Sequence, residues 1–178
     1  MYTGSLSPKL ATSYIRSCLD GPLLSQLKLV YSLLYPTMNL EEIDFNTTFR
    51  RYSSVTCRGI NFSSKRNNII YAIVIPDHSN STPEPRPVIL HYFVMHTLNS
   101  NGIARQHLLA AVSWLKQHPA KYHYEKPLEV WWKDLIDYHQ NMFVPIQLLI
   151  CHAVHSDIKH EEQTVFLMCP VRNIPVIM

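Results

Sequence analysis

Charge and glycine are both scarce in this sequence of 178 residues, and each shortage excludes a class of protein. Asp, Glu, Lys and Arg make up 16% of the chain, against about 25% in an average soluble domain, while apolar residues make up 47%. A chain of this composition can bury a core and is not expected to be disordered. Its four glycines cannot form a glycine-rich phosphate loop, which argues against a helicase or an NTPase.

Membrane and targeting signals are also missing. No apolar run approaches ~20 residues, so no transmembrane helix and no membrane contact are expected. The opening MYTGSLSPKL lacks a basic stretch followed by an apolar one, so no secretory signal is predicted. The four cysteines lie far apart, without a Cys-x-x-Cys pair, and are expected to be reduced and buried in an intracellular protein that is not secreted.

The first 38 residues are predicted to form a helical hairpin. Apolar residues recur at helical spacing over 7–19, after a Ser-Pro pair that suits a helix start, and again over 23–34. Asp20-Gly21-Pro22 is expected to end the first helix, and Pro36 to end the second. We expect this N-terminal helical segment, 1–38, to pack on a larger domain formed by residues 39–178.

Short strands separated by turn residues are predicted from residue 48 onward. Alternation around Val55 and Phe62, with Gly59 between them, predicts a hairpin. The Asn-Gly step within 99–102 predicts a second hairpin with strands over 88–98 and 105–119, although a helix over 104–116 is the competing interpretation. Residues 78–87, rich in Pro and Ser, predict a long loop. Further strands are expected over 67–77, 127–132, 141–154 and 163–171.

These elements together predict an α+β protein that is mainly β. The helical hairpin is expected to pack on a curled antiparallel sheet of about six or seven strands, or on a small β-barrel. Because an open sheet edge invites pairing with other chains, we expect the sheet to be closed enough to hide its edges.

Ten histidines raise the question of a zinc site. No pair lies at i, i+4 on a predicted helix, and no His-Glu-x-x-His motif is present. We therefore favour surface and half-buried histidines on strands and predict no metal and no cofactor. The alternative is a fragment of a metal-dependent hydrolase or nuclease that uses the histidines. The near pairs that the sequence offers for such a site are His91/His96, His118/His123 and His152/His155.

Other catalytic arrangements have little support. The sequence has no Gly-x-Ser-x-Gly nucleophile motif. A two-metal nuclease needs several carboxylates on a core sheet, and the predicted strands carry almost none. We therefore predict that the chain is not an enzyme.

The stretch 45–76 carries five basic residues and no acidic one, with Tyr52 and Phe62 interleaved. Such a stretch can contact phosphate groups. Five charges over 32 residues also fit a solvated hairpin with a basic rim, so both interpretations stay open. The candidate nucleic-acid contacts are Arg50, Arg51, Arg58, Lys65 and Arg66.

Aromatic residues are the other candidate site, either as core or as a ligand surface. Large rings fill small barrels well, so core is favoured for Trp114, Trp131 and Phe143. Trp132 faces opposite to Trp131 on a strand and must be exposed or covered by the helices. An aromatic cage for a methylated lysine would need several rings around one cation. The full candidate set is Tyr92, Phe93, Trp114, Trp131, Trp132 and Phe143.

An ordered set of strings over residues 89–154 resembles known sequences: ILHYFVMHTL, HLLAAVSWLKQHP, KPLEVWW and FVPIQLLICHAV. The set resembles the C-terminal domain of uncharacterised proteins that DNA-transposon-like mobile elements encode in invertebrate genomes. The upstream LLYP and RRYSSVTCRGINFSS fit the same pattern, so the resemblance covers most of the chain from residue 29. It implies that the rest of a longer mobile-element polypeptide is one possible partner.

The same strings are similar, more distantly, to the bromo-adjacent homology (BAH) domain. Such domains are small β-barrels that bind chromatin or other proteins and are not enzymes. The resemblance implies a non-catalytic nuclear module that contacts DNA, a chromatin protein or another partner. The helical N-terminus departs from the pattern, and methyl-lysine recognition is not carried over. The matching positions are Tyr92-Phe93, Val112-Ser113-Trp114, Pro119 and the run from Val144 to Val154.

Overall fold

The computed structural model describes residues 7–40, 43, 45–65, 68–74, 83–100, 102–135 and 142–171. Strands account for 59% of these residues, and their single α-helix is α1 (Gly21–Leu34). The prediction of a mainly β protein with curled antiparallel sheets is confirmed. The strands are β1 (Lys9–Leu10), β2 (Ile15–Cys18), β3 (Thr48–Tyr52), β4 (Ser54–Cys57), β5 (Ile60–Ser63), β6 (Ile69–Ile73), β7 (Pro85–Ser100), β8 (Ile103–Gln117), β9 (Glu129–Leu135), β10 (Phe143–Pro145), β11 (Leu149–His160) and β12 (Gln163–Pro170).

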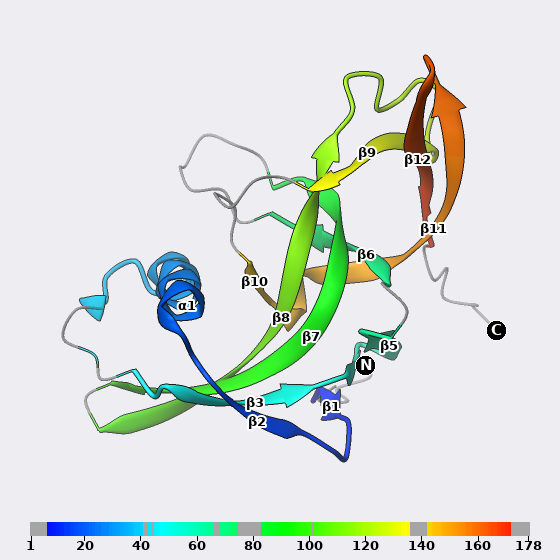
Figure 1. Ribbon diagram of the computed structural model, residues 1–178. Coiled ribbons are helices and arrows are strands. Elements are labelled where there is room, and N and C mark those ends of the chain that lie inside the picture. The colour runs from blue at the N-terminus through cyan, green and yellow to red at the C-terminus, as the bar shows by residue number, and fades with distance from the viewer. Residues whose placement is uncertain are drawn as a thin grey trace, which may run out of the picture.

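The long hairpin of β7 and β8 runs through the whole molecule (Figure 1). Its turn contains Gly102 with a φ of +75°, a conformation that glycine adopts without strain. A shift of register between Leu90 and Tyr92 marks a β-bulge, which bends the pair and increases its twist. The strand prediction for this region is therefore confirmed, and the competing helix over 104–116 is wrong.

Six strands pair in a closed circuit at the upper right of Figure 1. The pairing runs from β6 to β7, β8, β9, β12 and β11 and returns to β6, always antiparallel. Each of the six strands contributes to one hydrophobic cluster, so this cluster joins the whole circuit. Its members are Ile69, Ile89, Leu115, Trp131, Ala153, Phe166 and Met168.

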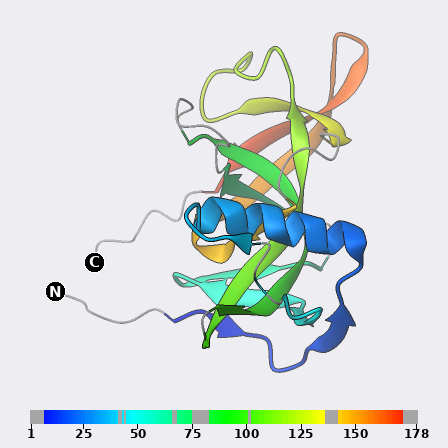
Figure 2. The ribbon, with the colours of Figure 1, turned by 90° about the vertical axis from the view of Figure 1, so that its left-hand side faces the viewer.

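The other end of the hairpin belongs to a wider sheet with α1 on one face. Here β3 pairs with β7, β2 with β3, and β10 with β8. The helix lies across this sheet (Figure 2) and buries Leu27, Val30 and Tyr31 completely. These three helix residues form a hydrophobic cluster with residues of the sheet: Val94 and Leu98 of β7, Leu109 and Ala111 of β8, Phe49 of β3 and Phe143 of β10.

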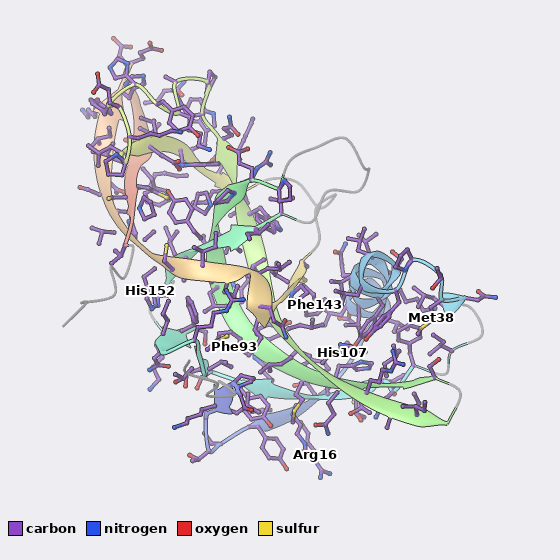
Figure 3. The ribbon with its side chains drawn as sticks, turned by 180° about the vertical axis from the view of Figure 1, so that it is seen from behind. Arg16, Met38, Phe93, His107, Phe143 and His152 are labelled. Carbon is purple, nitrogen blue, oxygen red and sulfur yellow. The ribbon has the colours of Figure 1, made fainter. Side chains whose placement is uncertain are left out.

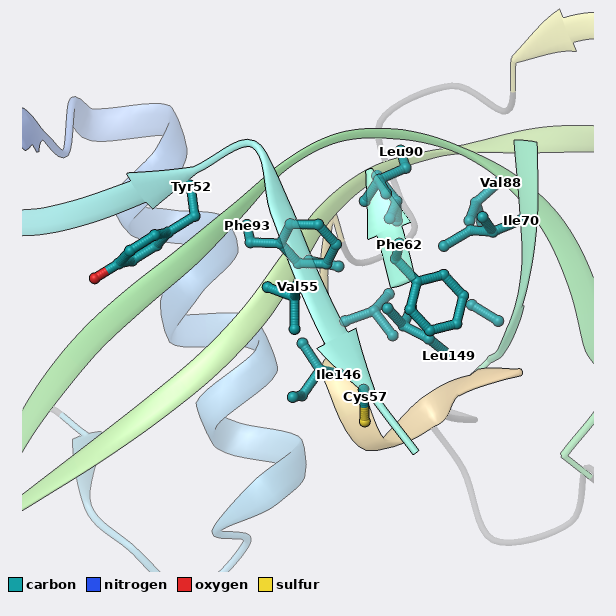
Figure 4. Close-up of a cluster of buried hydrophobic side chains, with 14 of the residues drawn as sticks. Tyr52, Val55, Cys57, Phe62, Ile70, Val88, Leu90, Phe93, Ile146 and Leu149 are labelled. Atoms are coloured by element: carbon teal, nitrogen blue, oxygen red, sulfur yellow. The ribbon is translucent and has the colours of Figure 1, made fainter. Parts of the chain in front are cut away.

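The opposite face of the hairpin is covered by β4 and β5, which form a second sheet with β1. Val55 and Phe62 of this small sheet pack with Phe93 of β7 and with Leu149 of β11 (Figure 4). The predicted β4–β5 hairpin is confirmed, and Gly59 in its turn has a φ of +79°. The β7–β8 hairpin is thus buried on both faces.

The predicted first helix, over 7–19, is wrong. Residues 15–18 form β2, an edge strand paired with β3, so pairing with a distant segment overrides the local helical spacing. Asp20-Gly21-Pro22 begins α1 instead of ending a helix: Asp20 is the N-cap, and its Oδ1 accepts a hydrogen bond of 2.9 Å from the N–H of Leu23. The second predicted helix, 23–34, is confirmed.

Three details of the predicted strands also change. The strand over 141–154 is divided into β10, the 3-10 turn Ile146–Leu148 and β11. The predicted loop over 78–87 is shorter, because β7 begins at Pro85; residues 78–82 lie outside the described part. The main sheet has nine strands instead of six or seven. The prediction undercounted because it took short edge strands such as β2 for helix or loop.

Trp114 tests the packing between β8 and the small sheet. Trp114 is 4% exposed and belongs to the cluster that contains Val55 and Phe62. The variant Trp114→Ala should lower the free energy of unfolding by about 3–5 kcal/mol, because it leaves a cavity in a close-packed core. Urea unfolding measures this, with Trp132→Ala, at a partly exposed position, as the matched control. Equal midpoints for the two variants would contradict the packing.

Candidate anion-binding groove

The basic residues predicted to form one patch are distributed over different faces. Arg50 and Arg51 are neighbours on β3, so their side chains point to opposite sides of the sheet. Arg51 stacks on Tyr92, with its Cζ 4.0 Å from the ring centroid. Arg58 lies in the β4–β5 turn and Lys65 just after β5, while Arg66 lies outside the described residues. The prediction of a single surface therefore needs revision.

Arg50 instead faces a residue that the sequence prediction missed. Arg16 of β2 lies directly opposite Arg50 of β3 in the antiparallel register, and both side chains are exposed. Both lie on the side of the sheet away from α1, since Phe49, the neighbour of Arg50, packs against the helix. Figure 3 shows Arg16 on that side. The helix predicted over 7–19 concealed this pair, because only strand pairing brings the two positions together.

The Arg16–Arg50 pair lines a groove of about 360 Å³. This volume lies within the ~300–1,000 Å³ range of typical ligand clefts. Among the described residues, its lining has two arginines, several hydroxyl and amide side chains, and no carboxylate. We call it the Arg16–Arg50 groove; it is formed by Arg16, Ser17, Cys18, Asn46, Thr48, Phe49, Arg50, Met95, Thr97 and Gln106.

Two contacts hold polar side chains of the groove in place. The Cζ of Arg50 lies 5.0 Å from the centroid of the Tyr14 ring, a cation–π contact that orients the guanidinium. Asn46 Oδ1 accepts hydrogen bonds from the N–H of Thr48 at 2.9 Å and from Thr48 Oγ1 at 2.8 Å. The amide oxygen of Asn46 is therefore engaged within the protein, and its Nδ2 group carries the remaining donors.

Asn46 is in turn connected to α1 through His96. His96 is fully buried; its Nε2 donates to the carbonyl of Asn46 at 2.8 Å, and its Nδ1 accepts from the hydroxyl of Tyr31 at 2.9 Å. This assignment requires a neutral imidazole. Burial lowers the pKa of His96 below its ordinary value, partly offset by the bond to Asn46, so the neutral form is favoured. Through these two hydrogen bonds, His96 of β7 connects α1 to the Arg16–Arg50 groove.

The predicted aromatic set does not converge on one cation. Trp131, Phe93 and Phe143 are completely buried, in three different clusters. Tyr92 is half-buried beneath Arg51, and the half-buried Trp132 packs at a tilt against His118, with ring centroids 4.2 Å apart. These rings therefore serve packing in the described structure, and no aromatic cage is formed from them.

Three of the ten histidines form a row. His160 lies between His118 and His123, with ring centroids 5.2 and 4.8 Å apart. Its Nε2 is buried without a hydrogen-bond partner among the described residues, 4.0 Å from the Glu161 carboxylate. Within the described residues, no group of three or more His, Cys, Asp or Glu side chains has the arrangement to hold a metal ion. The pairs His91/His96 and His152/His155 lie elsewhere on β7 and β11.

A larger cleft of about 870 Å³ contains a neutralised ion network. Lys121, 3% exposed, donates to Glu84 at 2.6 Å and lies 3.9 Å from Glu129. Glu129 Oε2 also accepts from the Tyr71 hydroxyl and from Trp131 Nε1, each at 2.9 Å. Burial alone would lower the pKa of Lys121, but its hydrogen bonds and the two carboxylates raise it. Because Lys121 is paired with both Glu84 and Glu129, the network fixes the segment after β8.

No protein-family model, no curated protein and no solved structure matches this chain. The resemblance to mobile-element proteins and to the BAH domain therefore stays a prediction from sequence strings. Within the described residues, no helix combines the length and the apolar character needed to cross a bilayer.

Buried histidines predict that acid destabilises the protein. Burial lowers the pKa values of His91, His96 and His107, whereas the unfolded chain has a histidine pKa of about 6.5. Below that pH the unfolded chain binds more protons, so the free energy of unfolding should fall as the pH drops from about 7 to 5. Thermal unfolding across this range measures the effect.

The variant His96→Gln isolates the contribution of the His96 network. It should cost about 1–3 kcal/mol at neutral pH, through the lost hydrogen bonds, and should flatten the pH dependence. His155→Gln, at an exposed position, is the control and should keep the dependence of the parent. An unchanged slope in His96→Gln would contradict the role given to His96.

Proposed function

We propose that this chain is a non-catalytic interaction module that contacts nucleic acid through the surface formed by β1 to β5. The unequal distribution of charge between the two ends of the molecule supports this proposal best. Nucleic acid is the natural partner of a cationic surface whose charges form no ion pair with the described residues.

All ion pairs between described residues lie between positions 84 and 161. They join Glu84 with Arg86 and Lys121, Glu129 with Lys121, Lys133 with Asp157, and His160 with Glu161. The described residues of 7–65 include seven Lys and Arg but only one acidic residue, Asp20. None of those seven cations forms an ion pair with a described residue; Glu41, Glu42 and Asp44 lie outside the described part.

The strand pairing agrees with the BAH-like part of the proposal. A BAH-like barrel over 39–178 would need strands that close on themselves, and the circuit from β6 through β8 to β11 has that connectivity. We therefore retain the proposal of a nuclear, chromatin- or DNA-contacting module from a mobile-element polypeptide. Because β2 and β3 pair across position 38, we include the segment before residue 39 in the proposed module.

Salt dependence tests this function. We expect weak binding to DNA, insensitive to sequence, because the described cationic surface has no helix placed to read bases. If two to four phosphates are contacted, the log–log slope of affinity against salt on duplex DNA should be about −2 to −4. Fluorescence anisotropy with labelled duplex and single-stranded DNA over a range of salt concentrations measures it. Absence of binding at low salt would remove nucleic acid from the proposal.

A further inference from the structure

We infer that the Arg16–Arg50 groove is a phosphate-binding site, which holds one phosphodiester group between its two guanidinium groups. The choice of a nucleic-acid backbone as the source of that phosphate rests on the function proposed above. The site itself rests on the geometry of the groove, and the two can be tested separately.

The first argument is the like-charge pair. Residues directly opposite each other on antiparallel strands have Cβ atoms about 5 Å apart, where like charges destabilise the sheet. Neither Arg16 nor Arg50 has a carboxylate partner among the described residues. A bound anion would turn this repulsion into attraction to both strands, and the forked guanidinium suits phosphate oxygens.

The second argument is the donor character of the lining. Asn46 has its amide oxygen engaged by Thr48, so its free hydrogen-bonding capacity is that of a donor. Thr97 and Gln106 are paired across β7 and β8 and add a hydroxyl and an amide. The described lining residues include no carboxylate and several donors, a combination that suits an anion and disfavours a metal cation.

The third argument is that the arginine is positioned before any ligand arrives. Tyr14 holds the guanidinium of Arg50 by the cation–π contact described above, so less side-chain entropy is lost when an anion binds. Arg50 lies between Arg16 of β2 and Met95 of β7, and each of the two is its direct partner across the sheet. The apolar Met95 limits water on one side of the groove, which strengthens charge–charge attraction there.

Other cations of the same region lack these features. Arg51 lies on the opposite face and is stacked on Tyr92. Arg58, in the β4–β5 turn, and Lys65, just after β5, line none of the described pockets. They therefore provide a matched control with the same loss of charge.

The test compares Arg16→Ser/Arg50→Ser with Arg58→Ser/Lys65→Ser in the full chain. A short labelled oligodeoxythymidylate is the probe, and thermal unfolding verifies that both variants fold. We expect about a tenfold or greater loss of affinity in the groove variant and less than about a threefold loss in the control, with a shallower salt slope only in the former. Equal losses in both variants would show diffuse attraction and would overturn the groove.

Cys18 provides an independent measurement within the groove. It is exposed and lines the groove, whereas Cys57 and Cys151 are buried, so its alkylation by iodoacetamide can be followed by peptide mass spectrometry. Pyrophosphate and the oligonucleotide should each slow alkylation of Cys18 in the parent but not in Arg16→Ser/Arg50→Ser.

The two probes separate the site from the function. Protection by pyrophosphate without binding of any oligonucleotide would support the phosphate site and reject the nucleic-acid function. Oligonucleotide binding that leaves the alkylation rate of Cys18 unchanged would support the function and reject this site. Protection by neither probe would overturn the phosphate site.

Discussion

The burial of the β7–β8 hairpin on both faces is the constraint on which the rest of the structure depends. Successive residues of a strand point to opposite faces, so neighbours such as Phe93 and Val94 supply different clusters. Further along the same ladder, Ile89 and Leu115 supply the cluster shared by the six-strand circuit. One hairpin therefore has apolar partners on nearly every side, and its β-bulge allows it to bend from the wide sheet into the circuit.

The same alternation connects the hairpin to the Arg16–Arg50 groove. On β7, His96 points toward α1 and meets Tyr31, while Met95 and Thr97 point to the other face and line the groove. His96 also donates to the carbonyl of Asn46. The packing of α1 on one face of the sheet therefore fixes Asn46, which lines the groove on the other face. The buried hydrogen bonds of His96 therefore hold the backbone of the groove in place. The exposed Arg16 and Arg50 add positive charge to this fixed backbone.

Local signals were sufficient to predict much of the fold. The leucine run of α1, the glycine turn between β4 and β5, and the turn after β7 were all read correctly, because each depends on residues close together in the chain. The segment 7–19 was misread because its apolar spacing fits a helix while pairing with β3 decides its structure. The prediction that Asp20 ends a helix is wrong for a related reason. The sequence Asp-Gly-Pro can end one helix or begin the next, and here Asp20 caps the start of α1.

The candidate site was less predictable than the fold. Arg50 was identified from the absence of acidic neighbours in the sequence, but its partner Arg16 was not, because the register of β2 on β3 is a tertiary property. The basic residues were grouped by sequence proximity, whereas the pleat of β3 sends Arg50 and Arg51 to opposite faces. Likewise, His118, His123 and His160 meet only because the β11–β12 turn folds back onto the segment after β8.

Native-state amide hydrogen exchange tests most directly whether the hairpin unites the molecule. If it does, the amides of Val94, Leu109 and Leu115 should exchange only through global unfolding, with one common free energy equal to that from urea unfolding. Leu109 reports on the sheet beneath α1, and Leu115 reports on the six-strand circuit. A lower free energy at Leu115 than at Leu109, or the reverse, would show that the two ends unfold independently and would contradict the account.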